Sequence, residues 1–387
     1  MNKPVYKRLL LLPLLVLLTS LCLLTSVRAE EAKTVEEEMP AEFAGLLDSI
    51  PEYIRPYLPE ELFSNDAGQV AEAVQRMSSF SYLCETLLSI VGLRIRECAG
   101  ILASVCGLLL LSALFGAIRS SFQSEGIGRA FSFCTTLTVT LSLITYSTRC
   151  LKSVTSYFST ISAMTAALLP LTGTLYAMGG NVTAATASAT GLSVYMTVLE
   201  ELVGKSILPF CGLCMALALV SALNPSLRMG SLLSTVKKNY TTALAFLMML
   251  LLAMLAAQNT LSARSDTLLM RSAKFAAGNL IPVVGGSVSE LLRTVSASVG
   301  FLRGTVGICG VLLLLLTLLP TLVELLLFRL TWQLSASLAD LLGCDGEKKL
   351  IDEFASLLGY LITAISICSS VLLLSLSLLT HCASAIG

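Results

Sequence analysis

Residues 305–328 read TVGICGVLLLLLTLLPTLVELLLF and contain one charged side chain, Glu324. A helix needs about 20 mostly apolar residues to cross the hydrocarbon core of a bilayer. The stretch therefore predicts a transmembrane helix. Glu324 lies four residues after Pro320, and an ionisable group at membrane depth is a candidate functional residue. Two interpretations stay open: a charge that pairs with Arg329 or Arg303 or binds a coupling ion, and a carboxylate at the membrane interface.

The composition of the whole chain is equally apolar. Of its 387 residues 55% are hydrophobic and 13% are charged, and the mean hydropathy is +0.83. Soluble domains carry about 25% charged residues, so a soluble globular enzyme is excluded. The net charge is zero, so nothing indicates nucleic-acid binding. With His381 as the one histidine, chemistry that needs two histidines is excluded too. We expect no catalytic residues, no metal site and no cofactor.

Further stretches have the length and composition of transmembrane helices. Five are clear, at residues 98–118, 130–148, 206–223, 241–258 and 358–380. Two more, 157–178 and 182–199, are rich in Ser, Thr, Ala and Gly, which let helices in a membrane approach closely, so we interpret them as protein-facing spans or half-spans. The sequence thus predicts an all-α polytopic integral membrane protein with six to eight transmembrane helices. Leu325 to Leu342 is expected to be an amphipathic helix on the membrane surface, and Asp345 to Glu353 a solvated turn.

The N-terminal part divides into two predicted segments. Residues 1–29 carry basic residues, an apolar run and small residues at Val27 and Ala29, which is typical of a signal peptide cleaved before Glu30; an uncleaved anchor is the alternative. Residues 30–85 contain 13 acidic and 3 basic residues, a net charge of −10, and are predicted to be an extracytoplasmic module. Within it Val70, Ala73, Val74, Met77 and Leu83 recur at helical spacing. This helix packs on the chain's own membrane domain, residues 86–387, or faces a partner or lipid headgroups.

Two segments combine proline and glycine inside apolar sequence. Residues 162–173 and 272–285 share Ser-Ala-x-x-Ala-Ala followed by Pro-x-x-Gly, which places Pro170 with Gly173 and Pro282 with Gly285. Proline removes a backbone hydrogen bond, so each copy is expected to break its helix near membrane depth, as in transporter and channel sites. A chance match of small residues is the alternative.

The second copy is the stronger candidate for a functional element. Gly278, Asn279, Pro282, Gly285 and Gly286 lie within nine residues, which predicts a re-entrant segment that lines a conduit; a kinked helix or an interfacial turn is the alternative.

Cys211 and Cys214 have C-x-x-C spacing, which in a soluble protein can indicate redox or metal chemistry. Here both lie inside an apolar span, with no second C-x-x-C motif. We interpret them as packing residues.

The segment from Lys274 to Gly286, KFAAGNLIPVVGG, and the Gly- and Leu-rich span after it resemble the stage III sporulation protein AE family of endospore-forming bacteria. The order of signal, acidic module and polytopic membrane domain is also similar. The resemblance implies a multi-pass protein in the mother-cell membrane that surrounds the forespore. It also implies a role in a channel or secretion-like complex that supports late forespore gene expression. The implied partners are other membrane proteins of the stage III sporulation complex and the lipid bilayer. Assembly of several copies of the chain into a homo-oligomer is compatible with the resemblance. The family offers no catalytic residues to carry over.

Two other functions fit the sequence. A secondary transporter would build a solute site from the two broken segments. A structural membrane anchor would recruit partners through residues 30–85. The chain has no G-x-x-x-x-G-K-[ST] motif, so nothing indicates nucleotide-driven energy coupling.

Overall fold

The structure is a computed structural model that describes residues 39–119, 125–178, 182–199, 201, 205–223, 229–280 and 285–384. These parts of the chain are helical and contain no strand. The elements are α2 (Glu42–Asp48), η1 (Arg55–Tyr57), η2 (Glu60–Phe63), α3 (Ala67–Met77), α4 (Phe80–Arg119), α5 (Glu125–Met178), α6 (Val182–Val198), α7 (Lys205–Leu223), α8 (Met229–Leu280), α9 (Gly285–Leu341) and α10 (Asp345–Ser384). The predicted signal peptide lies outside the described residues and stays a prediction.

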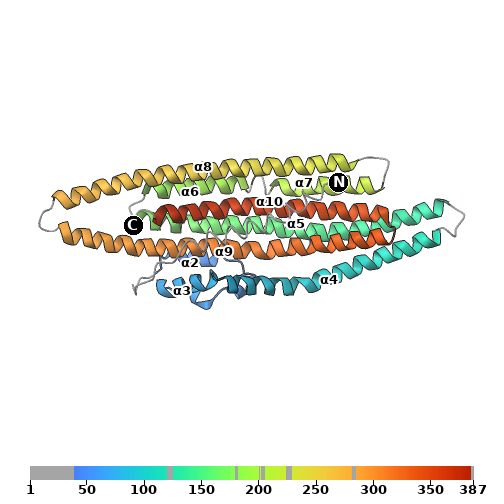
Figure 1. The fold of residues 1–387 in the computed structure, drawn as a ribbon, viewed down its shortest axis with the longest axis horizontal. Coiled ribbons are helices and arrows are strands. Elements are labelled where there is room, and N and C mark those ends of the chain that lie inside the picture. Colours follow the sequence, from blue (N-terminus) through green and yellow to red (C-terminus); the bar gives the residue numbers. More distant parts are fainter. Residues whose placement is uncertain are drawn as a thin grey trace.

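Five long helices form an elongated bundle, in which α4, α5, α8, α9 and α10 lie side by side (Figure 1). All five are long and apolar enough to cross a membrane. At a rise of 1.5 Å per residue, the 54 residues of α5 extend about 81 Å. The hydrocarbon core of a bilayer measures about 30 Å. The bundle is therefore much longer than one hydrocarbon layer is thick.

The break expected at Pro170 and Gly173 is not present. Residues 130–148 and 157–178, predicted as two separate segments, belong to the single helix α5, which continues through Pro170. Proline is tolerated in membrane helices when Ser or Thr hydroxyls and neighbouring helices bond nearby backbone groups. Thr172 Oγ1 lies 2.9 Å from the Leu168 carbonyl oxygen, within the turn that contains the proline. Composition alone could not distinguish this continuous helix from a broken one.

Helices α9 and α10 form the central hairpin of the bundle. The turn between them contains Gly343 at φ 72°, a conformation that glycine adopts without strain. Its N–H donates to the Asp340 carbonyl, and the Cys344 N–H donates to the Ala339 carbonyl. This Schellman pattern ends α9 and reverses the chain. The surface helix expected from Leu325 is instead a continuation of α9, and the expected solvated turn is the first part of α10.

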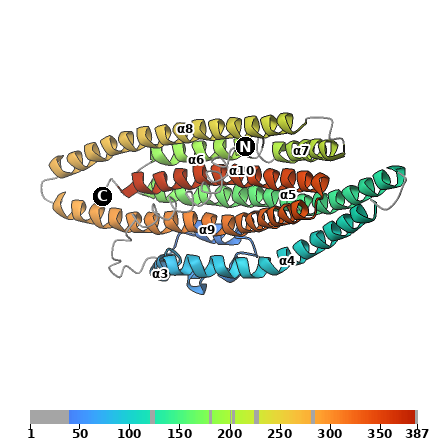
Figure 2. The same cartoon turned by 45° about the vertical axis from the view of Figure 1, so that its right-hand side comes forward.

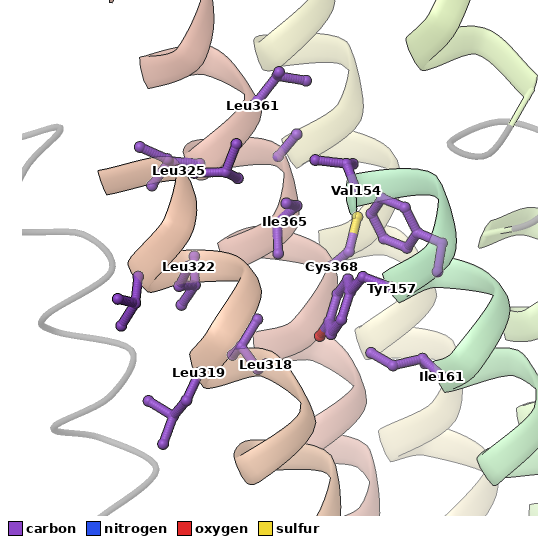
Figure 3. Packing of buried hydrophobic residues seen from close by; sticks show 14 of the residues in the cluster. Val154, Tyr157, Ile161, Leu318, Leu319, Leu322, Leu325, Leu361, Ile365 and Cys368 are labelled. Atoms are coloured by element: carbon purple, nitrogen blue, oxygen red, sulfur yellow. The ribbon is translucent and has the colours of Figure 1, made fainter. Parts of the chain in front are cut away.

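The apolar core lies between α5, α9 and α10. Figure 3 shows Val154, Tyr157 and Ile161 of α5 directed toward Leu318 of α9 and Ile365 of α10. The candidate spans of α9 and α10 are mostly buried within the protein, whereas only a minority of residues in those of α4 and α8 are buried. The leucine run that predicted a transmembrane helix therefore packs mostly against other helices of the chain. A helix that is apolar on all sides is typical of either environment.

Helices α6 and α7 follow one another along α8 in both views (Figures 1 and 2). They contain 17 and 19 residues. The apolar helices in this part of the chain are shorter than the five candidate spans, so the predicted number of six to eight spans stays a prediction.

Residues 42–77 form a small helical cap on the side of the bundle. In this cap, α2 contacts α5 and α3 contacts α9 (Figure 1). Asp66 caps α3, since its carboxylate accepts a hydrogen bond from the Gly68 N–H at 2.8 Å. The predicted amphipathic helix ends at Met77, and Leu83 lies on α4. All members of the predicted apolar face are nevertheless buried: Val70, Ala73, Val74, Met77 and Leu83. This burial favours packing on the chain's own helices. The proposed division at residue 85 falls inside α4 and stays a prediction.

Candidate functional site

The most prominent polar site in the bundle surrounds Glu324, whose side chain is 4% exposed. Its Oε2 lies 3.5 Å from Arg94 Nη2 of α4, and its Oε1 lies 3.9 Å from Arg149 Nε of α5. The Ser153 hydroxyl, also on α5, lies 3.3 Å from both carboxylate oxygens. Three helices therefore meet at one buried carboxylate.

A second carboxylate completes this site. Glu97 of α4 pairs with Arg149 and lies 3.4 Å from Arg94 Nη1. Each guanidinium thus faces two carboxylates, and both guanidinium groups are partly exposed. A buried carboxylate costs free energy unless it is paired and hydrogen-bonded, and these contacts supply both conditions. We call Arg94, Glu97, Arg149, Ser153 and Glu324 the ion cluster.

Glu324 was predicted as either an intramembrane or an interfacial charge, and it is a buried charge within an apolar helix. Burial inside the bundle does not distinguish these two interpretations, so both stay predictions. The described ion pairs of Glu324 reach α4 and α5, whereas the sequence suggested partners on its own helix. One of these, Arg329, packs against α10: a Cβ placed on Gly359 would lie 2.9 Å from Arg329 Cζ. The side chain of Arg303 lies outside the described residues.

A buried lysine joins α8 to α10. Lys237 is 1% exposed, and its Nζ lies 2.8 Å from Glu353 Oε2 and 3.2 Å from the Glu353 carbonyl oxygen. The ammonium also lies 6.0 Å from the centre of the Tyr360 ring, a favourable cation–π distance. The sequence does not distinguish Lys237 from its neighbour Lys238, because two adjacent lysines are typical of a basic loop between spans.

A third buried charge, Glu347 of α10, is held by hydroxyl groups. Its Oε1 accepts hydrogen bonds from Ser112 of α4 at 3.0 Å and from Thr135 and Thr136 of α5, each at 3.3 Å. Glu347 also lies in the first turn of α10, where the helix dipole stabilises a negative charge. These interactions anchor the end of α10 to the α4–α5 hairpin.

Together the three polar sites connect all five long helices. Leucine-rich helix faces allow many similar packings, whereas hydrogen-bonded charges allow few. Sliding one helix along its neighbours would separate these partners, so the three sites favour this helix register. Among the residues that the structure describes, no group of three or more His, Cys, Asp or Glu side chains could hold a metal ion. Cys211 and Cys214 are buried, unbridged side chains of α7.

The predicted re-entrant segment is only partly covered by the structure. Gly278 and Asn279 lie in the last turn of α8, and Gly285 and Gly286 begin α9. Pro282 lies outside the described residues. Helix boundaries therefore flank the segment where the sequence predicted a break, and its role as a conduit lining stays a prediction.

The comparisons with known proteins address the family of this bundle. A family model described as "Stage III sporulation protein AE (spore_III_AE)" matches residues 68–383, which include all five long helices. The chain belongs to this family. The stage III sporulation protein AE of Bacillus subtilis (strain 168) is 24% identical over 367 residues, which cover 92% of this chain and 90% of that protein. No solved structure matches the chain significantly.

Membership of the stage III sporulation protein AE family confirms the resemblance seen in residues 274–286 and assigns the chain a role in sporulation. The apolar helices are those of a membrane protein in the sporulating cell.

Proposed function

We propose that this protein is an integral component of the channel or secretion-like complex that joins the mother cell to the forespore and supports late forespore gene expression. It resides in the mother-cell membrane around the forespore and works with other membrane proteins of the stage III sporulation complex. The observation that carries the proposal is the family match over all five long helices. The ion pairs and hydrogen bonds that connect the five long helices support it, because a protein that lines a channel needs a defined helix packing.

The filled core bears on where a conduit would run. Leu312 to Leu316 of α9 are all at most 2% exposed. A path along the α9–α10 hairpin would have to displace these side chains. A conduit between neighbouring copies or between this chain and its partners is therefore favoured over one through a single chain.

Residues 278–286 are our candidate for the part that faces the conduit. Glycines permit close backbone approach, and the Asn279 amide carries both donors and an acceptor. Single cysteines from 279 to 287, in a background without native cysteines, would be labelled by a membrane-impermeant thiol reagent if the segment lines a wet path. Uniform resistance from both sides, with normal sporulation of a Gly285→Leu strain, would contradict this role.

Sporulating cells test the main proposal. We expect a deletion strain to lose late forespore gene expression and the full chain to restore it. Tagged protein should co-purify with other sporulation membrane proteins. Normal forespore gene expression in the deletion strain would contradict the proposal.

A structural membrane anchor is the second candidate function. The packed leucine core favours it, because a path along the α9–α10 hairpin would have to displace these side chains. The two candidates differ in the Gly285→Leu strain, which should block a conduit but leave an anchor intact. Solute-specific counterflow by the purified chain alone in liposomes would instead support a secondary transporter.

A further inference from the structure

Glu347 of α10 is a buried carboxylate that forms no ion pair with any described residue. The residue is 5% exposed. Two nearby lysines bind other carboxylates, since Lys348 Nζ lies 2.6 Å from Asp340 Oδ1 and Lys237 Nζ lies 2.8 Å from Glu353 Oε2. A buried carboxylate costs free energy unless an opposite charge lies beside it. The described contacts give Glu347 hydrogen bonds but no positive charge.

The two helices that face Glu347 carry no basic residue at its level. The turn between α9 and α10 lies against the α4–α5 hairpin, which extends past it (Figure 1). Residues 98–118 of α4 and 130–148 of α5 contain no charged side chain. Ser112 and Thr136, which contact Glu347, each lie seven positions from the nearest arginine in the sequence, which is about 10 Å along a helix.

Oxygen atoms from three helices meet at this carboxylate. The hydroxyl oxygen of Ser112 lies 3.0 Å from Glu347 Oε1, and those of Thr135 and Thr136 each lie 3.3 Å from it. A hydroxyl group has one proton that rotates and two lone pairs that accept. The groups that donate to the carboxylate can therefore also bind a cation beside it. Oxygen atoms of this kind are the ligands that hard cations prefer.

The spacing and charge of these oxygens suit a small monovalent ion. At metal–oxygen distances of about 2.0–2.6 Å, two ligands at right angles are about 2.8–3.7 Å apart. The distances of 3.0–3.3 Å from Oε1 fall within this range. One carboxylate balances one positive charge, whereas a divalent ion would leave an excess charge in a buried site. Among the monovalent ions, sodium has the required size.

The charges around the site attract cations. Residues 340–353, which form the α9–α10 turn and the start of α10, contain five acidic and two basic residues, a net charge of −3. Lys348 is paired with Asp340, and Lys349 is exposed. A negative local potential raises the concentration of cations nearby.

We propose that Glu347 and the hydroxyl groups of Ser112, Thr135 and Thr136 bind a sodium ion between α10 and the α4–α5 hairpin. The ion neutralises the buried carboxylate and links α10 to both helices of the hairpin. Its binding therefore stabilises the packing of the α9–α10 turn against α4 and α5. The proposal does not depend on a role in a channel.

The test measures the melting temperature of the full chain in detergent with sodium, potassium or choline chloride at equal ionic strength. We expect sodium to raise the melting temperature in a saturable way, above the values in potassium and choline. Glu347→Gln keeps the size of the side chain but removes its charge, so it should abolish this difference. Asp345→Asn removes the same charge from an exposed site in the same helical turn and is the matched control. It should keep the full sodium effect.

A second variant keeps the test valid if Glu347→Gln does not fold. Thr136→Val exchanges one hydroxyl ligand for a methyl group, and it should raise the half-saturating sodium concentration about three- to tenfold. Direct binding is measured by broadening of the sodium NMR signal, which should be stronger for the parent chain than for either variant.

Four results would overturn the proposal. They are an equal rise in choline or potassium chloride, an undiminished sodium effect in Glu347→Gln, an equal loss of that effect in Asp345→Asn, and a half-saturating concentration unchanged by Thr136→Val. Stabilisation of the parent chain by low pH alone, without any sodium effect, would show that a proton neutralises Glu347 and would overturn the sodium site too.

Discussion

Glu324 of α9 and Arg94 of α4 form an ion pair, with 3.5 Å between Oε2 and Nη2, although 230 positions separate them in the sequence. Glu324 is buried among leucines, so its charge is stable there because α4 and α5 bring two arginines to it. Sliding of α9 by one turn would remove the carboxylate from both guanidinium groups. The pair therefore sets how the central hairpin sits against α4 and α5.

Substitution of Glu324 by Gln should destabilise the protein. The neutral amide keeps the size of the side chain but loses charge-assisted contacts with two arginines, so we expect the free energy of unfolding to fall by about 1–3 kcal/mol. The partial exposure of both guanidinium groups limits the loss. Thermal unfolding in detergent measures it. Glu85→Gln, at an exposed site on the same helix as Arg94, should stay within about 0.5 kcal/mol of the parent. Equal effects of the two substitutions would contradict the importance of the ion cluster.

Lys237 and Lys238 provide a matched pair of neighbouring lysines. Lys237→Met removes the partner of Glu353 from a buried site and should cost near the lower end of about 3–5 kcal/mol, because Glu353 keeps some exposure to solvent. Lys238→Met changes an exposed side chain and should have an effect within about 0.5 kcal/mol. Thermal unfolding of both variants in the same detergent measures this difference in stability. A Lys238→Met variant as unstable as Lys237→Met would show that the Glu353 contact is not the cause.

The sequence predicted features that depend on local periodicity. The buried face from Val70 to Leu83 follows from apolar residues at helical spacing, and the structure confirms it. The apolar runs of α9 and α10 predicted helices correctly, but hydropathy does not distinguish a helix in lipid from one in a protein core.

The site residues were harder to predict because their partners are distant in the sequence. Apart from Arg94 and Glu97, which lie three residues apart on α4, the ion cluster joins residues 52, 171 and 230 positions apart, and no spacing rule within a helix relates those. The prediction of a helix break at Pro170 was wrong for a local reason. A proline in an apolar sequence does not show whether neighbouring groups satisfy the freed backbone groups and so keep the helix continuous. The sequence did indicate Glu324 as a candidate site residue, because a single charged side chain within a run of leucines needs a partner on another part of the protein.

Gly359 should be sensitive to the addition of a methyl group. A Cβ there would lie 2.9 Å from Arg329 Cζ, and Arg329 is buried, so its guanidinium must shift. We expect Gly359→Ala to cost about 1 kcal/mol and Gly359→Leu to cost more. Gly346 lies in the same helix with no atom within 4 Å of the added carbon, so Gly346→Ala should be neutral or stabilising. If the two alanine variants have the same melting temperature, close packing of Arg329 on Gly359 does not constrain the hairpin.

The exposed acidic side chains of the cap should contribute to binding of partner proteins. Residues 30–85 have a net charge of −10, and Asp48, Glu52 and Glu72 are exposed. A strongly acidic surface attracts basic proteins and is repelled by anionic lipid. Reversal of these three residues to Lys should weaken co-purification with other sporulation membrane proteins while membrane insertion is retained. Deletion of the cap is a poorer test, because it would uncover apolar surface on α5 and α9.

Leu62→Ala separates charge from folding in the same cap. Leu62 is fully buried, so its truncation should destabilise the cap by about 2–5 kcal/mol without any change in charge. Limited proteolysis measures this loss. If the exposed acidic side chains bind partners, the charge-reversed cap should resist the protease like the parent and still bind poorly, because its substituted side chains are exposed to solvent. Normal co-purification of the charge-reversed protein, with loss of binding only when Leu62 is truncated, would mean that partners recognise the folded cap through other contacts and that its charge serves only to keep it out of the lipid.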